Sequence, residues 1–335
     1  MIAQLVAAAA TLIAPAATDR LPPAPAIRVA RPFRVQVYAS GLEHPTAMAF
    51  GPRGALYVAE DVGRVVAVFP GGRPRLVADG IPTPLGLVRR GAQLYVSAQG
   101  QLLRLTVRDG RVVSRRTIVS GLPYGRHQQD NVVFGPDGRL YFGSGSTCDV
   151  CVERDPRSAT ILSVRPDGTG LKVVARGLRN AYGLAREPRT GRLYASVNGQ
   201  DEIDRPGDPE PAEMVVEVRQ GRFFGWPRCW PSARLLRLQG SCRGATPPVA
   251  YLEPHSSADG MAFWRGDLYV AEWGTYRQSP FGKRVVRVRL RGPLRRRVSV
   301  FASGFEHPLA VLPDRTGGLL VSDWGRGLIY RISRR

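Results

Sequence analysis

The chain has 335 residues, of which 43% are hydrophobic and 22% are charged, and it carries a formal net charge of +21. This composition excludes an intrinsically disordered protein, because it supplies enough apolar side chains for a substantial core. The charge suggests a polyanionic partner such as a nucleic acid, but the arginines are spread along the whole chain and no recognition motif accompanies them. We therefore expect no nucleic-acid partner.

The N-terminal segment, residues 1–17, is uncharged, rich in Ala, Leu, Ile and Val, and ends near the small-residue sequence Ala14-Pro15-Ala16. This pattern predicts a signal peptide, and the apolar run is too short for a stable membrane span. Residues 18–32 are rich in Pro and Ala and are expected to form a linker. We expect the mature protein to be periplasmic or secreted.

An internal repeat decides the fold class. Residues 38–50, YASGLEHPTAMAF, and residues 301–313, FASGFEHPLAVLP, are two copies of one unit. A short strand phrase follows each copy and occurs six times, at Leu56-Tyr57-Val58, Leu94-Tyr95-Val96, Leu140-Tyr141-Phe142, Leu193-Tyr194-Ala195, Leu268-Tyr269-Val270 and Leu319-Leu320-Val321. Six such units, separated by turns and alternating strands, predict an all-β protein, a six-bladed β-propeller that spans residues 33–335 as one domain.

Two further features of the propeller follow from the pattern. The strand Phe33–Ala39 is expected to join the last blade and close the ring, because an open ring would expose two sheet edges. The longest gap between strand phrases, which follows Leu193, is expected to be an insertion between blades 4 and 5 that contains Cys229 and Cys242.

The four cysteines support export. We expect disulfides between Cys148 and Cys151 and between Cys229 and Cys242, since this one of the three possible pairings closes two separate loops. The alternatives are a zinc site or a redox-active CxxC motif. Zinc is disfavoured because no histidine lies close in sequence to either pair, and a redox motif requires a βαβ context that the chain lacks.

Polar residues recur at two positions that a propeller brings to the same mouth of its channel, just before the innermost strand and just after the second strand of a blade. All four histidines, His44, His127, His255 and His307, occupy the first position. His44 and His307 lie in matching Glu-His-Pro phrases, which favours a turn-capping role, whereas His127 and His255 lie in unlike contexts and are functional candidates. The second position holds Glu60, Asp61, Gln99, Ser146, Asn198, Gln200, Asp201, Glu272 and Asp323. One polar mouth is therefore the predicted active site.

Several phrases of the chain match one family. They are Gly125-Arg126-His127 with NVVFGPDG at residues 131–138, GLRNAYGL at residues 177–184, NGQDE at residues 198–202 and GWP at residues 225–227. From about residue 33 to residue 335, the chain resembles the soluble quinoprotein glucose/sorbosone dehydrogenases. The resemblance implies pyrroloquinoline quinone and Ca²⁺ as cofactors, a sugar or related alcohol or aldehyde as the small-molecule substrate, and an external electron acceptor.

The resemblance also implies the residues of the site. The expected catalytic base is His127, seven residues before Phe134, and a neutral histidine near pH 7 suits the removal of a hydroxyl proton. The expected quinone-binding residues are Arg179, Asn180, His255 and Lys283. The expected calcium loop consists of Asn198, Gly199, Gln200 and Asp201, which offer the hard oxygen ligands that calcium prefers.

The chain departs from the glucose enzymes of this family at three places. Ser146 stands where those enzymes have an aspartate. Phe305 and His307 stand near the final blade where they have two arginines, and PLGL at residues 84–87 replaces part of a GGLLG phrase.

Two other functions are compatible with a polar propeller mouth. A metal-dependent, lactonase-like hydrolase would need several carboxylates on one ion, and Glu60, Asp201, Glu272 and Asp323 are the candidates. A non-catalytic extracytoplasmic propeller would bind a carbohydrate or a partner at the same mouth, and the fold by itself does not distinguish it from an enzyme.

Overall fold

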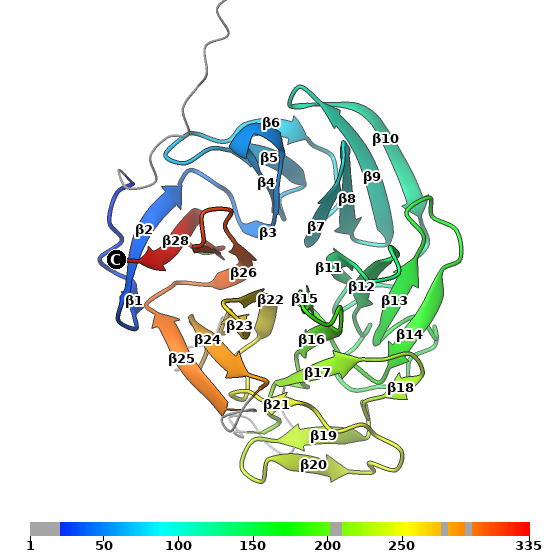
Figure 1. The fold of residues 1–335 in the computed structure, drawn as a ribbon. Coiled ribbons are helices and arrows are strands. Elements are labelled where there is room, and N and C mark those ends of the chain that lie inside the picture. Colours follow the sequence, from blue (N-terminus) through cyan, green and yellow to red (C-terminus); the bar gives the residue numbers. More distant parts are fainter. Residues whose placement is uncertain (1–20, 202–209, 276–280, 292–296) are drawn as a thin grey trace, which may run out of the picture.

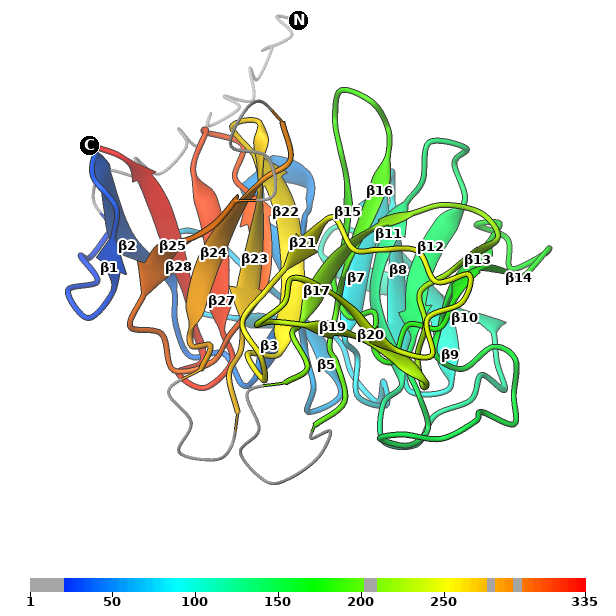
Figure 2. The same ribbon diagram turned by 90° about the horizontal axis from the view of Figure 1, so that it is seen from below.

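The structure is a computed structural model that describes residues 21–201, 210–275, 281–291 and 297–335. Its strands form six blades around a central axis, each beginning with a strand that lies next to the axis (Figure 1). Seen at 90° to that view, the strands run between two faces of a disc (Figure 2). The predicted six-bladed β-propeller is confirmed. The described residues include one short 3₁₀ turn, η2 (Pro52–Gly54), and no α-helix.

Each blade has an innermost, a second, a third and an outer strand. The innermost strands of blades 1 to 6 are β3 (Pro45–Phe50), β7 (Gly86–Arg90), β11 (Gln129–Phe134), β15 (Leu184–Arg186), β22 (Ala258–Trp264) and β26 (Pro308–Pro313). The second strands, which contain the repeated strand phrases, are β4 (Leu56–Glu60), β8 (Gln93–Ala98), β12 (Leu140–Ser144), β16 (Leu193–Val197), β23 (Asp267–Glu272) and β27 (Leu319–Asp323).

The outer half of each blade completes the sheet. The third strands are β5 (Arg64–Val68), β9 (Gln101–Arg108), β13 (Thr160–Val164), β17 (Met214–Val218), β24 (Arg284–Arg289) and β28 (Leu328–Arg334). The outer strands are β6 (Arg75–Ala78), β10 (Arg111–Val119), β14 (Lys172–Arg176), β21 (Ala250–Tyr251), β25 (Arg297–Ser303) and β2 (Phe33–Ala39). Within each blade, these neighbouring strands pair antiparallel, and the short β18 (Arg222–Phe223) adds a parallel edge to blade 3.

The ring closes through the N-terminal strand, as predicted. β2 pairs antiparallel with β28, from Phe33 opposite Arg334 to Ala39 opposite Ile329. Figure 1 shows these two strands side by side, so blade 6 is built from both ends of the described chain. Closure leaves no gap between the first and last blades, and the pairing covers an edge that would otherwise be open.

The described part of the segment expected as a linker lies against the propeller. β1 (Arg28–Val29) pairs with β25, and Leu21 and Ile27 are buried. The backbone of Val37 donates a hydrogen bond to the carbonyl of Pro22 at 2.8 Å. Residues 22–24 therefore lie along β2 of blade 6, and Arg28–Val29 extend blade 5. The expected signal peptide, residues 1–17, lies outside the described residues.

The apolar core lies between the blades. One cluster joins Tyr57 and Val65 of blade 1 to Leu94 and Leu103 of blade 2, and further clusters join other neighbouring blades in the same way. The second and third strands are buried on both faces, which is why their sequences are runs of Val, Leu, Tyr and Ala. Each blade thus covers the apolar face of its neighbour.

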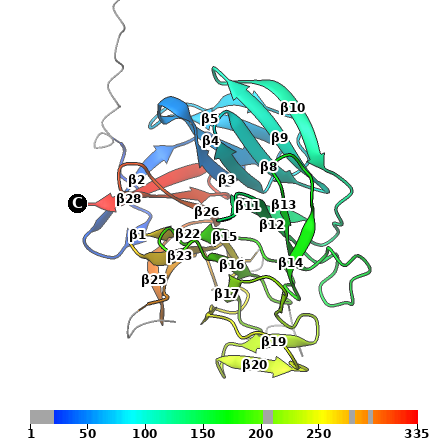
Figure 3. The same ribbon diagram turned by 45° about the vertical axis from the view of Figure 1, so that its right-hand side comes forward.

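Both expected disulfides are formed, Cys148 with Cys151 and Cys229 with Cys242. The second closes a hairpin of β19 (Cys229–Ser232) and β20 (Arg237–Gly240), which projects at the rim (Figure 3). The expected position of this insertion was wrong: it lies inside blade 4, between β17 and β21. β21, the outer strand of blade 4, follows the hairpin in the sequence and pairs with β17.

No helix long and apolar enough to cross a membrane is found among the described residues.

Hydrogen bonds between blades hold the innermost strands at one level. Ser and Thr hydroxyls donate to backbone carbonyls of the next blade: Thr46 to Pro84 at 2.6 Å, Ser196 to Asp259 at 2.5 Å, Ser322 to Pro45 at 3.2 Å, and Ser97 to Asp130. At Gly183, a Cβ atom would lie 2.1 Å from the carbonyl oxygen of Asp259, so this close approach requires glycine.

We predict that Ser196→Ala destabilises the protein by about 1 to 3 kcal/mol, because it removes the hydroxyl that donates to the Asp259 carbonyl of blade 5 at 2.5 Å and accepts the buried Gly183 N–H at 2.9 Å. Urea unfolding followed by fluorescence measures this loss. The control is Ser114→Ala, at an exposed serine of β10, where we expect a change below about 0.5 kcal/mol. Equal effects of the two substitutions would contradict the role given to the inter-blade hydrogen bonds.

Candidate active site

A cavity of about 650 Å³ opens at one mouth of the propeller. Every blade contributes to its lining, blades 1 to 6 with Asp61, Leu85, His127, Asn180, His255 and Trp324, respectively. These residues lie just before an innermost strand or just after a second strand, because the two strands are antiparallel and their loops meet at the same face. The polar mouth expected from the repeat is therefore where the cavity lies.

His127 is held by the loop that follows β12. Its Nδ1 lies 3.0 Å from Ser146 Oγ and 3.2 Å from the Ser146 carbonyl oxygen. Ser146 Oγ donates its own proton to the carbonyl of Cys148 at 2.7 Å, so toward the imidazole it can only accept. Both partners of Nδ1 are thus acceptors. The proton of the neutral ring resides on Nδ1, and Nε2 is left as the basic nitrogen.

The environment of His127 keeps the ring neutral. Burial lowers the pKa of His127 to about 3, and the nearby Arg179 and Arg126 guanidinium groups contribute to this lowering, against the opposing effects of the Ser146 carbonyl and Asp149. The ring also packs closely on the backbone: a Cβ atom at Gly145 would lie 2.4 Å from His127 Cβ. At neutral pH, His127 is an oriented proton acceptor.

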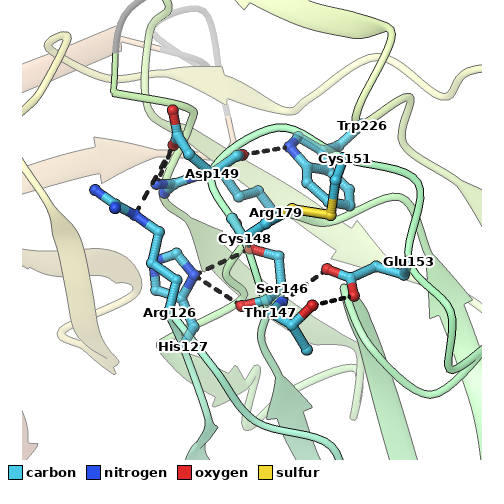
Figure 4. The surroundings of a disulfide bond; sticks show 10 residues. All are labelled: Arg126, His127, Ser146, Thr147, Cys148, Asp149, Cys151, Glu153, Arg179 and Trp226. Atoms are coloured by element: carbon cyan, nitrogen blue, oxygen red, sulfur yellow. Dashed lines mark hydrogen bonds and ion pairs between the residues drawn. A yellow bond between two sulfur atoms is a disulfide. The ribbon is translucent and has the colours of Figure 1, made fainter.

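Two arginines and two aspartates surround this histidine (Figure 4 shows the arginines with Asp149). The Arg179 side chain, only 4% exposed, donates from Nη2 to Asp149 Oδ1 at 2.6 Å and to Asp201 Oδ1 at 3.0 Å. Its Nε donates to the Asp149 carbonyl at 3.2 Å. Arg126 also pairs with Asp201 and lies 4.0 Å from Asp149 Oδ1. These partners fix the guanidinium groups beside the imidazole.

The wall formed by blades 4 and 5 is rich in oxygen atoms. Asn198 Nδ2 donates to Asp259 Oδ1 at 3.0 Å, and Glu213 accepts the backbone N–H of Gly199 at 2.5 Å. Burial raises the pKa of Glu213 to about 8 and that of Asp259 to about 7. Within the described structure, the buried Oδ1 atoms of Asn180 and Asn198 have no hydrogen-bond partner. Such unpaired acceptors are suited to a donor or a cation.

The part of the wall formed by blades 5 and 6 is aromatic and contains Trp273 and Trp324. His44 stacks on Trp324 with ring centroids 3.9 Å apart, and Asp61 accepts hydrogen bonds from Trp324 Nε1 at 2.7 Å and from His44 Nδ1 at 3.1 Å. His307 stacks on Trp273 at the same centroid distance. Neither of these histidines lines the cavity, so they support the tryptophans, while His127 and His255 line it.

The other residues expected from the sequence are distributed unevenly. Asn198, Gly199 and Asp201 line the cavity with Arg179 and Asn180, but Gln200 instead lines a small adjoining cavity. Lys283 is exposed and does not line the cavity, although it lies against Gly274, which does. Phe305 is buried in the core and packs on Tyr330.

Three of the four carboxylates considered for a hydrolase do not reach the cavity. Glu60, Glu272 and Asp323 end their second strands fully buried within the blades. Glu60 and Glu272 pair with Arg64 and Arg284, and Asp323 accepts the backbone N–H groups of Glu306 and His307 at 2.9 Å each. The expected convergence of Glu60, Asp201, Glu272 and Asp323 on one ion is wrong, because the strand-end position faces the blade interior, and of the four only Asp201 lines the cavity.

Sequence reasoning missed several residues of the mouth. Asp149, Glu213, Asp259, Trp273 and Trp324 hold or line the site, and none was singled out. A signal was present for Trp273 and Trp324, since each directly follows the acidic residue that ends a second strand. For Asp149 the signal was the CxxC motif, because Asp149 lies between its two cysteines.

The fold and the cavity together define a six-bladed β-propeller with one polar mouth. A sequence model of the family Glucose / Sorbosone dehydrogenase matches residues 92–279, more than half of the chain. The protein belongs to this family.

Solved structures show the same architecture. A putative oxidoreductase (glucose dehydrogenase) from Thermus thermophilus is 28% identical, with a TM-score of 0.73 over 90% of this chain and 100% of that chain. The pyrroloquinoline-quinone-bound aldose sugar dehydrogenase of Streptomyces coelicolor is 23% identical, with a TM-score of 0.73 over 92% and 98%. A Trichoderma reesei carbohydrate-active enzyme of family AA12 is 18% identical, with a TM-score of 0.81 over 93% and 98%. The last two show likeness of fold.

We predict that His127 remains neutral down to about pH 4, because its pKa in the folded protein is about 3. Since the unfolded residue has a pKa near 6.5, the unfolded state binds the extra proton first as the pH falls from about 6.5 toward 3. His127 should therefore make the free energy of unfolding fall by up to about 1.4 kcal/mol per pH unit in this window.

Imidazole NMR signals recorded from pH 8 to pH 4 test this, with His127 assigned by the signal that is missing in His127→Gln. The same variant should show a weaker loss of stability between pH 6 and pH 4 than the wild type. A His127 titration midpoint near 6.5 would contradict the description of its environment.

Proposed function

We propose that the protein is a quinoprotein dehydrogenase that oxidises a sugar or a related alcohol or aldehyde, with pyrroloquinoline quinone and Ca²⁺ as cofactors and His127 as the base. The observation that carries this proposal is the hydrogen bonding of His127. Its Nδ1 is held by two acceptors on Ser146, so its free nitrogen Nε2 is unprotonated in a cavity that also contains Arg179. Membership of the Glucose / Sorbosone dehydrogenase family supports the same assignment.

The residues present fit the quinone, which is a flat anion with three carboxylates. A cavity of about 650 Å³ is large enough for it, and Arg126 and Arg179 supply positive charge at the wall. The unpaired Oδ1 of Asn180, a residue of the same wall, offers an acceptor for the pyrrole N–H of the quinone. We assign Arg179, Asn180 and His255, which line the cavity, as quinone-binding residues, and Lys283 as a charged residue at the rim.

The residues also fit a calcium ion. Calcium takes six to eight oxygen ligands, and the loop at Asn198 and Gly199 combines an unpaired amide oxygen with the neighbouring carboxylates of Glu213 and Asp259. A divalent cation beside Glu213 and Asp259 would favour their ionised forms against the effect of burial. We propose that the loop Asn198, Gly199, Gln200 and Asp201 forms the calcium site.

The chemistry divides between the protein and its cofactors. When bound, the quinone and its calcium supply the hydride acceptor. His127 Nε2 accepts the hydroxyl proton of the substrate as the carbon is oxidised, because its partner nitrogen is already protonated. Arg179 stabilises negative charge that develops beside it, and its burial makes this stabilisation stronger than it would be in water. The indole rings of Trp273 and Trp324, which line the cavity and are held from behind by His307 and His44, are suited to the apolar face of a sugar ring.

The two disulfides support a location outside the reducing cytoplasm, and we propose that the protein acts in the periplasm or after secretion. Electrons then pass to an external acceptor. The expected signal peptide, residues 1–17, belongs to the same proposal.

We predict that the purified apoprotein reduces a dye with an aldose only after both pyrroloquinoline quinone and Ca²⁺ are added. His127→Ala should lower turnover by about 10² to 10⁴ while the cofactor absorbance is retained, because a general base is lost. Arg179→Ala should weaken both quinone binding and turnover, because it removes a charge-assisted contact. Steady-state kinetics and a quinone titration measure these effects.

The matched control is Arg157→Ala, which removes another arginine that is paired with an aspartate, Asp155, but does not line the cavity. This variant should bind quinone and turn over as the wild type does. If the wild-type protein fails to bind quinone at micromolar concentration with Ca²⁺ present, the proposed function is wrong. Lactone opening with metal alone would point instead to a hydrolase.

A second prediction concerns the metal. Asn198→Ala should raise the Ca²⁺ concentration needed for quinone binding by about 10 to 10², because it removes the unpaired oxygen of a residue that lines the cavity. Gln200→Ala is the informative comparison within the loop, since its side chain lines the adjoining cavity. Fluorescence of Trp273 and Trp324 follows the Ca²⁺ titration. An unchanged Ca²⁺ requirement in Asn198→Ala would remove this residue from the proposed calcium site.

A further inference from the structure

The loop Cys148-Asp149-Val150-Cys151, closed by its own disulfide, lies beside Arg179 and His127, which line the cavity (Figure 4). Asp149 does not line the cavity, and nothing in the proposed chemistry uses it. The disulfide joins cysteines only three residues apart. Such a short loop constrains the unfolded chain little, so the bond has a small entropic effect on global stability and its main effect is on local geometry.

One side of this loop holds Arg179. The Asp149 carboxylate accepts from Arg179 Nη2 at 2.6 Å, and the Asp149 carbonyl accepts from Arg179 Nε at 3.2 Å. The same carbonyl accepts from Trp226 Nε1 at 3.3 Å, and the carboxylate accepts the backbone N–H of Asp201 at 3.2 Å. Asp149 therefore contacts Arg179 at two points. A buried guanidinium that loses such a partner is strongly disfavoured, so its position depends on Asp149.

The other side of the loop holds His127 through Ser146. Ser146 Oγ donates to the Cys148 carbonyl at 2.7 Å, which leaves only its lone pairs for His127 Nδ1. Glu153 anchors the loop from beyond the disulfide, because its carboxylate accepts the N–H and the hydroxyl of Thr147 at 2.7 Å each. The Cys148 carbonyl thus makes the Ser146 hydroxyl a second acceptor for His127 Nδ1, beside the Ser146 carbonyl oxygen at 3.2 Å, and both acceptors favour the proton on Nδ1.

We propose that the disulfide-closed loop Cys148–Cys151 positions both His127 and Arg179. Asp149 is the positioning residue for Arg179, and the Cys148 carbonyl, acting through the Ser146 hydroxyl, works together with the Ser146 carbonyl to keep the proton of His127 on Nδ1. This inference rests on the proposed function in its assignment of roles to His127 and Arg179. The contacts themselves exist without any cofactor, so the loop can be tested in the apoprotein.

The first experiment examines Arg179. In the apoprotein, the Nε–H signal of Arg179 should be visible by NMR and slow to exchange, because the side chain is buried and bonded. Asp149→Ala should speed this exchange about 10-fold or more and lower turnover of the reconstituted protein by about 10², mainly in kcat. Asp149→Asn, which keeps an acceptor but loses the charge, should restore part of both.

The control for this experiment is Asp155→Asn, since Asp155 also pairs with an arginine, Arg157, through its carboxylate but lies away from the cavity. It should leave the Arg179 signal and kcat unchanged. Unchanged Arg179 exchange in Asp149→Ala would overturn the positioning role, as would an equal effect of Asp155→Asn.

The second experiment examines the disulfide and the tautomer of His127. In the wild-type apoprotein, nitrogen NMR should show the proton of His127 on Nδ1. In the Cys148→Ser/Cys151→Ser variant, the Nε2-protonated form should become detectable, because the Cys148 carbonyl is no longer held and the Ser146 carbonyl is the one fixed acceptor left for Nδ1. The Cys229→Ser/Cys242→Ser variant, which opens the 13-residue link of the hairpin, should lose more thermal stability and keep the Nδ1 tautomer.

An unchanged tautomer in the Cys148→Ser/Cys151→Ser variant would overturn the inference, and so would the same tautomer change in the hairpin variant. Neither readout requires quinone or calcium. A wild-type protein that fails to bind quinone would therefore defeat the proposed function while leaving the positioning role of the loop to be decided by these spectra.

Discussion

The pairing of β2 with β28 brings residues from all six blades to one cavity. A propeller blade has no core of its own, because its apolar faces are covered only by the neighbouring blades. Closing the ring supplies the last of these neighbours, and the hydroxyl-to-carbonyl bonds from Thr46, Ser97, Ser196 and Ser322 then hold successive innermost strands at one level. Asp61 of blade 1 and Trp324 of blade 6 can share a hydrogen bond at 2.7 Å only in a closed ring.

The same rigid packing explains the electrostatics of the mouth. Charged groups that are taken out of water by the closed ring must find partners in the protein. Arg179 finds Asp149 and Asp201, whereas His127 is held through Nδ1 by Ser146 and stays neutral. An aspartate in place of Ser146 would favour the charged imidazole. Ser146 orients the His127 ring without adding a negative charge beside it. Ser146 therefore sets the orientation of the ring, whereas burial and the nearby arginines keep it neutral.

The repeat made the fold predictable, because each strand phrase repeats the apolar pattern that blade packing requires. It also placed His127, His255, Asn180 and Asn198 at the correct mouth, since antiparallel strands fix which loops share a face. It did not resolve single positions: Glu60 and Asp61 are adjacent, yet one is buried in the blade and the other faces the cavity. Successive side chains of a strand point to opposite faces, so a shift by one residue decides whether a side chain enters the blade or the cavity. The repeat alone does not specify the position to that precision. The pairing of Asp149 with Arg179 was equally hidden, because it joins residues 30 apart that only the closed fold brings together.

The six blades use one repeat position for two kinds of wall. In blades 5 and 6, the residue after the second strand is a tryptophan, and the histidine of the following blade stacks on it, His307 on Trp273 and His44 on Trp324. In blades 3 and 4, the corresponding loops instead carry Asp149 and Asp201, which hold Arg179 beside His127. An aromatic wall and a charged wall therefore line one cavity without any change in the backbone plan. In the proposed function, the aromatic wall would orient the sugar, and the charged wall would carry the proton transfer and the stabilisation of charge.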